Sequence, residues 1–173
     1  YKPNYDLKSK KKSIDEGRLL LQDFIRFVQT NPSASTLSDQ FDVDGFIKAQ
    51  AAEIVIGAVD HYVRVANNYY LYFNPLTEKW IYMPNDFDFT FRDHHPLAWG
   101  TPEWAAAFRD ITGTFAFPAN NKVDWASREL GDVSPILWEI VFSDDGNKDL
   151  LYEHIRFIID NYLQWSEVSQ KLY

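Results

Sequence analysis

The sequence predicts an α+β fold that is mainly helical and is arranged around one central β-hairpin. Two observations support this prediction: apolar residues recur at helical spacing in several segments, and two aromatic-rich runs flank a single loop. The chain has 173 residues, which is long enough for one domain to bury a sizeable core. We therefore expect a single domain over residues 1–173.

The first predicted helix follows a possible capping box. Ser13 and Glu16 have the required spacing, and an apolar stripe continues until Pro32 stops it, which predicts a helix over about residues 14–30. The next stretch, residues 33–40, is polar and is predicted to be a linker.

A second helix is predicted between Asp42, which suits an N-cap, and Gly57, which suits a helix end. Its residues are apolar enough to indicate a buried helix. Asp60 would then lie just beyond the end of that helix.

The hairpin is predicted from two short runs rich in aromatic and β-branched residues. Residues 69–73 and 80–83 are the two strands, and residues 74–79 form a longer loop between them. Asp86 and Asp88 follow the second strand directly. In an extended segment, residues two apart face the same side, so the two carboxylates would converge while Phe87 points into the core.

The C-terminal half is predicted to be helical again after a polar loop. Thr101 and Pro102 suit the start of a helix, and residues 113–121 look irregular. Two last helices are expected over residues 136–142 and about 147–164, the second with an apolar side. That apolar side comprises Leu151, Ile155, Ile158, Ile159 and Tyr162.

The composition argues against several classes of function. The formal charge is −8, with 25 acidic and 17 basic residues, which opposes nucleic-acid binding because that binding depends on Lys and Arg neutralising phosphates. The chain has no cysteine, so no disulfide or thiolate metal site is expected. It also has no apolar run of the roughly 18 residues that a membrane span needs.

The candidate site residues all carry oxygen donors. Asp86 and Asp88 suit a hard cation such as Mg²⁺, although this spacing is also common in turns. Asn67 and Asn68 offer amide oxygens, or serve as ordinary turn residues. Asp60 suits a base that orients a hydroxyl nucleophile, or a residue that hydrogen-bonds nearby backbone. The histidines His61, His94 and His95 match no zinc pattern and are assigned no chemistry.

These features occur in the order found in protein kinases, where a catalytic Asp precedes an Asn metal ligand and, after a hairpin, a metal-binding Asp. Over about residues 40–165 the sequence resembles the CotH kinase-like family, known from spore-coat and fungal surface proteins. The segments that carry the resemblance are DVDGF at 42–46, VD at 59–60, NNYYLY at 67–72, KWIYMPNDFDFTF at 79–91 and SPILWEIVF at 134–142.

The resemblance implies the C-terminal lobe of a divergent protein-kinase-like fold, in which the central hairpin carries the Asp-Phe-Asp motif. It also implies ATP and Mg²⁺ as cofactors and serine-containing coat or surface proteins as substrates. By position, Asp60 matches the catalytic aspartate, Asn68 the metal-binding asparagine and Asp86 the metal-binding aspartate, with Asp88 completing the motif. The implied location is extracellular, on a cell surface or in a spore coat.

The sequence departs from the family pattern at Ala58, where the family commonly has Asn, and at Asn85, where it commonly has Trp. Nothing before residue 40 resembles the strand-rich lobe that clamps ATP in kinases. We therefore expect the N-terminal nucleotide-clamping lobe to be absent from this chain, to be supplied by another segment or chain, and the isolated chain to have little activity.

Two alternatives remain open. Fungal members of the family are described as surface adhesins, so a non-enzymatic protein that binds a surface receptor is the main one. A sugar transferase that uses a nucleotide sugar and Mn²⁺ at its Asp-x-Asp motif is a weaker one, because no Rossmann-like glycine loop is present. The sequence determines neither the acceptor protein nor the oligomeric state.

Overall fold

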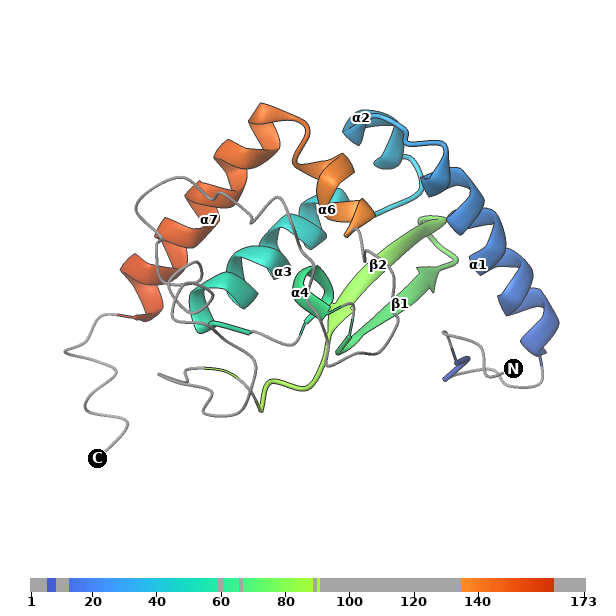
Figure 1. The fold of residues 1–173 in the computed structure, drawn as a ribbon, viewed down its shortest axis with the longest axis horizontal. Helices are drawn as coiled ribbons and strands as arrows, with labels where there is room; N and C mark the ends of the chain where they lie inside the picture. Colours follow the sequence, from blue (N-terminus) through green and yellow to red (C-terminus); the bar gives the residue numbers. More distant parts are fainter. Residues whose placement is uncertain are drawn as a thin grey trace, which may run out of the picture.

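Six helices and one two-stranded antiparallel sheet make up the described part of this computed structural model (Figure 1). The structure describes residues 6–8, 13–58, 61–65, 67–88, 90 and 135–163. The predicted α+β, mainly helical fold is confirmed. In chain order the elements are α1 (Ile14–Gln29), α2 (Ala34–Leu37), α3 (Val43–Ile56), α4 (Tyr62–Val65), β1 (Tyr69–Asn74), β2 (Lys79–Pro84), α6 (Ile136–Val141) and α7 (Asp145–Tyr162).

Some predictions fall outside the described residues. These are the loop with His94 and His95, the helix expected from Thr101 and Pro102, and the irregular stretch over residues 113–121. They stay predictions.

Helix α3 begins and ends as its sequence predicts. The Asp42 side chain accepts a hydrogen bond from the backbone N–H of Gly45 at 3.1 Å, which satisfies one of the free N–H groups of the first turn. Gly57 ends the helix with a φ of 67°, a left-handed conformation that glycine adopts without steric cost. Local signals therefore define both ends of this helix.

Helix α1 has the predicted length, but the predicted capping box at its start is wrong. Ser13 has φ −109° and ψ 37°, and its side chain makes no capping hydrogen bond. An N-cap usually has an extended backbone, which aims its side chain at the first turn. The ψ angle of Ser13 departs from that conformation, so the Ser-x-x-Glu spacing alone was misleading.

The polar stretch over residues 33–40 is more than a linker. It contains α2, which Ser33 caps by accepting a hydrogen bond from the backbone N–H of Thr36 at 3.1 Å. Leu37 at the end of α2 is fully buried. The short helix therefore contributes to the core and contacts α6, which the polar composition of the stretch concealed.

The hairpin is confirmed, with each strand slightly longer than predicted. Tyr69 pairs with Pro84 and Asn74 with Lys79. In the turn, the Asn74 side chain accepts a hydrogen bond from the backbone N–H of Leu76 at 3.0 Å, an Asx-type contact that stabilises the reversal. Burial alternates along both strands, so one face of the hairpin packs on the core and the other lies toward the surface.

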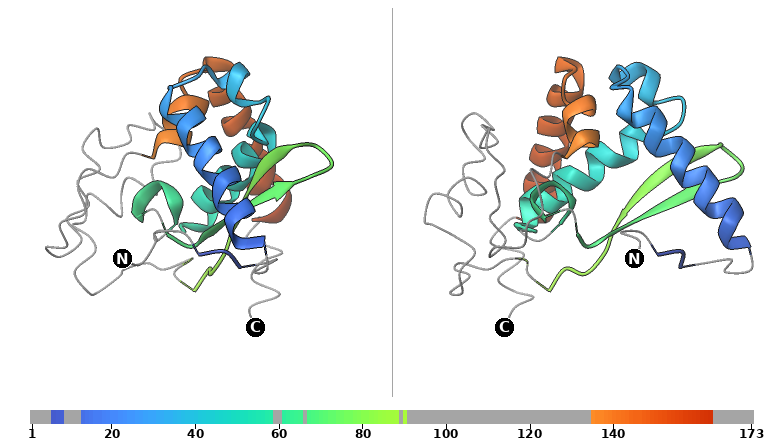
Figure 2. Two further views of the ribbon diagram at one scale, coloured as in Figure 1. Left: turned by 90° about the vertical axis from the view of Figure 1, so that its right-hand side faces the viewer. Right: turned by 45° about the vertical axis from the view of Figure 1, so that its right-hand side comes forward.

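Helix α3 lies at the centre of the described fold. It contacts α7 on one side and β2 on the other (Figures 1 and 2). On the same inner face of the hairpin, the ring of Phe24 from α1 stacks on that of Trp80 from β2, with centroids 5.4 Å apart. Helices α1 and α3 thus both pack on the inner face of the hairpin, and together they set its orientation.

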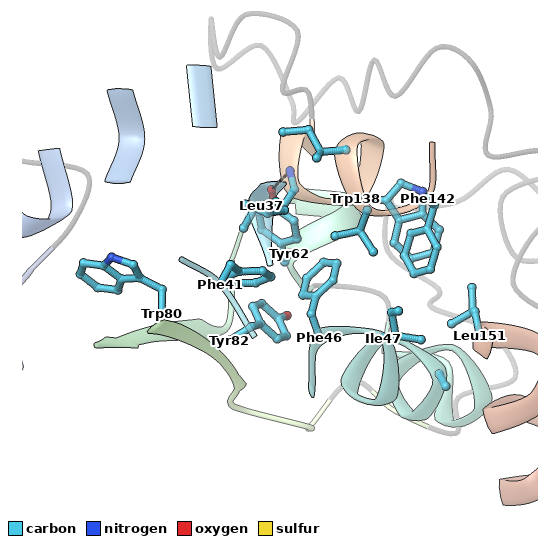
Figure 3. Close-up of a cluster of buried hydrophobic side chains, with 14 of the residues drawn as sticks. Leu37, Phe41, Phe46, Ile47, Tyr62, Trp80, Tyr82, Trp138, Phe142 and Leu151 are labelled. Atoms are coloured by element: carbon cyan, nitrogen blue, oxygen red, sulfur yellow. Dashed lines mark hydrogen bonds between the residues drawn. The ribbon is translucent and has the colours of Figure 1, made fainter. Parts of the chain in front are cut away.

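An aromatic cluster joins these elements (Figure 3). Phe46 of α3 meets Tyr82 of β2 edge to face, with ring centroids 5.2 Å apart, and Tyr62 of α4 packs against both. Such pairs contribute about 0.5–1.5 kcal/mol beyond the area they bury. The Tyr62 hydroxyl accepts a hydrogen bond from the backbone N–H of Leu137 at 3.1 Å, which links α4 to the start of α6.

The two C-terminal helices are confirmed, with α7 beginning slightly earlier than predicted. Asp144 caps α7 by accepting a hydrogen bond from the backbone N–H of Asn147 at 3.1 Å. Leu151 and Ile155 are buried as the apolar stripe predicts, but Tyr162 is 65% exposed. In the described part of the chain, no helix combines the length and apolar character needed to cross a bilayer.

The capping difference between α3 and α1 leads to a testable prediction. Asp42→Ala should lower the free energy of unfolding by about 1 kcal/mol, because one N–H of the first turn of α3 loses its partner. Ser13→Ala should change it by less than about 0.5 kcal/mol, because that side chain makes no capping bond. Urea unfolding of the two variants checks this; equal losses would contradict the assigned caps.

Candidate functional site

The candidate site lies at the end of the hairpin away from its turn, where β1 begins and β2 ends (Figure 1). The carbonyl oxygen of Asn68 accepts a hydrogen bond from the backbone N–H of Asn85 at 2.8 Å. This bond extends the strand pairing by one step beyond Tyr69 and Pro84. Asn68 therefore lies directly across from Asn85, one residue from Asp86.

Two residues at this end have left-handed backbones. Asn68 has a φ of 54° and Asp86 a φ of 61°. Among residues with a side chain, Asn and Asp enter this region most readily, although the conformation still has a cost. Asn68 is half-buried, whereas Asp86 and Asp88 are exposed. The strand thus ends abruptly at Asp86, and both carboxylates that follow it reach solvent.

The prediction that Phe87 points into the core is wrong. Its side chain is 42% exposed, and its ring lies beside that of His61, with centroids 4.8 Å apart. The prediction assumed that residues 86–88 continue the extended strand, where neighbours alternate between faces. The positive φ of Asp86 breaks that alternation, so the argument that the carboxylates of Asp86 and Asp88 converge no longer applies.

Asp60, the predicted catalytic residue, lies outside the described residues. Of the four predicted site residues, the structure brings Asn68, Asp86 and Asp88 to one end of the hairpin. The alternative amide donor, Asn67, is exposed next to Asn68.

A buried polar cluster lies behind this end of the hairpin, centred on Glu53 of α3. Glu53 is 5% exposed. Its Oε1 accepts a hydrogen bond from the hydroxyl of Tyr82 at 2.8 Å, and its Oε2 accepts one from Nε2 of Gln50 at 3.0 Å. Buried carboxylates are tolerated when their oxygens are hydrogen-bonded in this way.

Tyr82 acts in this cluster as a hydrogen-bond donor. Burial raises the pKa of its phenol well above the ordinary value, and the nearby negative charge of Glu53 raises the pKa further. Both effects disfavour the phenolate, because it would be a second negative charge away from water. The hydroxyl of Tyr82 therefore keeps its proton and continues to donate to Glu53.

His61 connects the buried cluster to the candidate site. It is 2% exposed. Its Nε2 lies 2.9 Å from the carbonyl oxygen of Asp86, and its Nδ1 lies 3.1 Å from Oε1 of Glu53, a close polar contact without the alignment of a good hydrogen bond. From the sequence we assigned no chemistry to His61. In the structure its ring lies between a buried carboxylate and the backbone of Asp86.

Sequence reasoning overlooked Glu53, although a signal was present. Glu53 is the one charged residue in the apolar run AQAAEIVIGA over residues 49–58. A single carboxylate in a helix that is otherwise buried needs hydrogen-bond donors, since an unpaired buried charge is costly. One partner, Gln50, lies three residues earlier on the same helix. Tyr82 of β2 and His61 before α4 lie at positions that no spacing rule connects to Glu53.

The donors at the end of the hairpin suit a hard cation. Carboxylate and amide oxygens are the ligands that Mg²⁺ prefers, and this ion often keeps several waters. Within the residues that the structure describes, no three His, Cys, Asp or Glu side chains gather into a metal-binding group. The candidate donors described there are the carboxylates of Asp86 and Asp88 and the amide of Asn68.

Helices packed around a hairpin, with exposed carboxylates after its second strand, form the arrangement expected of a kinase-like lobe. A family model described as CotH kinase protein matches residues 1–172. The chain therefore belongs to the CotH kinase family, and the resemblance inferred over about residues 40–165 extends to nearly the whole chain. Neither the curated proteins nor the solved structures contain a match to this sequence.

Proposed function

We propose that this chain is a lobe of an atypical protein kinase that uses ATP and Mg²⁺ to phosphorylate serine-containing coat or surface proteins. Membership of the CotH kinase family supports a kinase-like function. A second observation supports the proposal. At the end of the hairpin, Asn68 lies across from Asn85, and the exposed Asp86 follows Asn85 directly. The backbone segments that carry these donors thus lie side by side at one end of the hairpin.

The proposed roles follow from the chemistry of phosphoryl transfer, which depends on positioning and on electrostatic stabilisation. ATP supplies the phosphoryl group, and Mg²⁺ neutralises charge on its phosphates. Asp86 and Asn68 hold the metal, and Asp88 contributes a second carboxylate beside them. Asp60 orients the acceptor hydroxyl and accepts its proton.

In this proposal the chain corresponds to the second lobe of a kinase, which carries the base and the metal ligands. A nucleotide clamp from a further segment or chain would complete the site, because kinases hold ATP between two lobes. The partners are therefore that clamp and a protein substrate.

The test is calorimetric titration of the full-length protein with ATP in the presence and absence of Mg²⁺. We expect saturable binding with Mg²⁺ and binding weakened roughly tenfold or more without it, which corresponds to about 1.4 kcal/mol or more. Transfer of labelled phosphate to serine in a candidate coat protein should then require both ATP and Mg²⁺. If ATP bound with the same affinity in the presence and absence of Mg²⁺, the proposed metal site would be ruled out.

A second candidate function is receptor binding without catalysis, as an adhesin. The outer face of the hairpin favours it, because Tyr70, Tyr72 and Met83 are exposed and the strand register places Tyr70 opposite Met83. Aromatic residues and methionine are enriched where proteins bind one another. Saturable receptor binding by a full-length protein that binds no ATP would favour this function over the kinase.

A further inference from the structure

One histidine joins the buried interior to the proposed metal-binding aspartate. His61 and Asp86 are 25 residues apart in sequence, and the ring nitrogen Nε2 of His61 lies 2.9 Å from the backbone oxygen of Asp86. A carbonyl oxygen only accepts hydrogen bonds, so Nε2 must carry the proton and donate it. The contact therefore acts on the backbone of Asp86 and leaves its carboxylate available.

The ring of His61 is enclosed in the interior, with only 2% of the residue exposed. Nδ1 faces Oε1 of Glu53 at 3.1 Å. Glu53 is itself held by hydrogen bonds from Tyr82 and Gln50. Rotation of this buried imidazole would break the bond to Asp86, so packing keeps Nε2 pointing in one direction. A side chain packed in this way is a fixed support for what it binds.

The backbone that His61 supports has an unfavourable conformation. Asp86 has a φ of 61°, and residues with side chains keep such values only where their surroundings enforce them. Two hydrogen bonds flank this point: Asn85 N–H donates to Asn68, and the Asp86 carbonyl accepts from His61. The first ties the preceding residue, Asn85, to the start of β1, and the second ties Asp86 to the interior beside α3.

We propose that His61 is a positioning residue for Asp86: buried beside Glu53, it holds the backbone of Asp86 in the left-handed conformation that presents the carboxylate to solvent at the metal site. This inference rests on the proposed function in assigning a metal to Asp86. Residues that orient a ligand without touching the metal commonly change metal affinity by 10–100-fold when they are replaced.

Two conservative variants of His61 separate positioning from simple stability. In His61→Gln the amide nitrogen is at the ε position and can still donate to the Asp86 carbonyl. In His61→Asn it is at the δ position, which keeps a polar group toward Glu53 and loses the reach to Asp86. Tyr82→Phe is the control, because it removes a hydrogen bond from the same cluster without a contact to Asp86.

The first readout needs neither metal nor nucleotide. Backbone ¹⁵N relaxation in the full-length protein should give low order parameters for residues 85–88 in His61→Asn and order close to wild type in His61→Gln and Tyr82→Phe. Thermal unfolding of all three variants is measured in parallel. Unchanged order in His61→Asn would overturn the inference, and so would equal loss of order in all three variants.

The second readout is the Mg²⁺ concentration that gives half-maximal binding of ATP. We expect it to rise roughly tenfold or more in His61→Asn and less than about threefold in His61→Gln and Tyr82→Phe. Asp86→Asn separates the two proposals. If ATP binding by Asp86→Asn no longer depends on Mg²⁺ while His61→Asn needs the same Mg²⁺ concentration as the wild type, the positioning role is wrong and the metal site stands. If Asp86→Asn keeps the dependence, the metal assignment itself is wrong.

Discussion

Asp86→Asn should reduce Mg²⁺-dependent phosphate transfer by about 100-fold or more, the scale seen when one preorganised electrostatic contact is removed from a catalytic site. The substitution removes a charge at an exposed position. It should leave the fold intact because Asn tolerates the left-handed backbone that Asp86 adopts, with its φ of 61°. The measurement is the initial rate of transfer by the full-length protein at a series of Mg²⁺ concentrations.

Asp149→Asn is the matched control for that variant. Asp149 is exposed on α7, so its replacement changes the net charge by the same amount at a different element. We expect its transfer rate and its thermal unfolding to match those of the wild type. Unchanged transfer in Asp86→Asn, or an equal loss in both variants, would remove Asp86 from the site.

Asp60→Asn should lower turnover by roughly 10²–10⁴-fold, the contribution typical of a general base. Binding of Mg²⁺ and ATP should change much less, because in the proposed mechanism Asp60 acts on the acceptor hydroxyl and not on the nucleotide. Single-turnover rates together with calorimetric titration check this separation.

The contrast with Asp86→Asn makes the Asp60 prediction specific. A metal ligand should lose nucleotide affinity together with turnover, whereas a base should lose turnover alone. If Asp60→Asn weakens nucleotide binding as strongly as it slows transfer, Asp60 is a binding residue and another group must accept the proton.

The elements that the sequence predicted well have strong local signals. Helix α3 carries its own start at Asp42 and its own end at Gly57, and the hairpin carries runs of aromatic and β-branched residues on both sides of its turn. Such signals depend on residues a few positions apart, so they survive without knowledge of the rest of the fold. Where the local signal was weak or misleading, as at Ser13 and in residues 33–40, the prediction failed.

The candidate site was predictable only in part. The order of Asp60, Asn68 and Asp86 and the resemblance to CotH proteins were visible in the sequence, and the family assignment is confirmed. The roles of these residues stay predictions. Phe87 was misplaced because a single positive φ at Asp86 changes which way the following side chains point, and residue types alone do not reveal that angle.

By itself the sequence determined the family, the helices α1, α3, α6 and α7, the hairpin and the oxygen donors that follow it, because each of these depends on residue types at short spacing. The tertiary structure alone decided that Glu53, His61 and Tyr82 meet in the interior and that His61 bonds to the backbone of Asp86. Those contacts join α3, β2 and the residue that precedes α4. Packing brings these segments together, and the need of buried polar groups for partners selects the pairs they form.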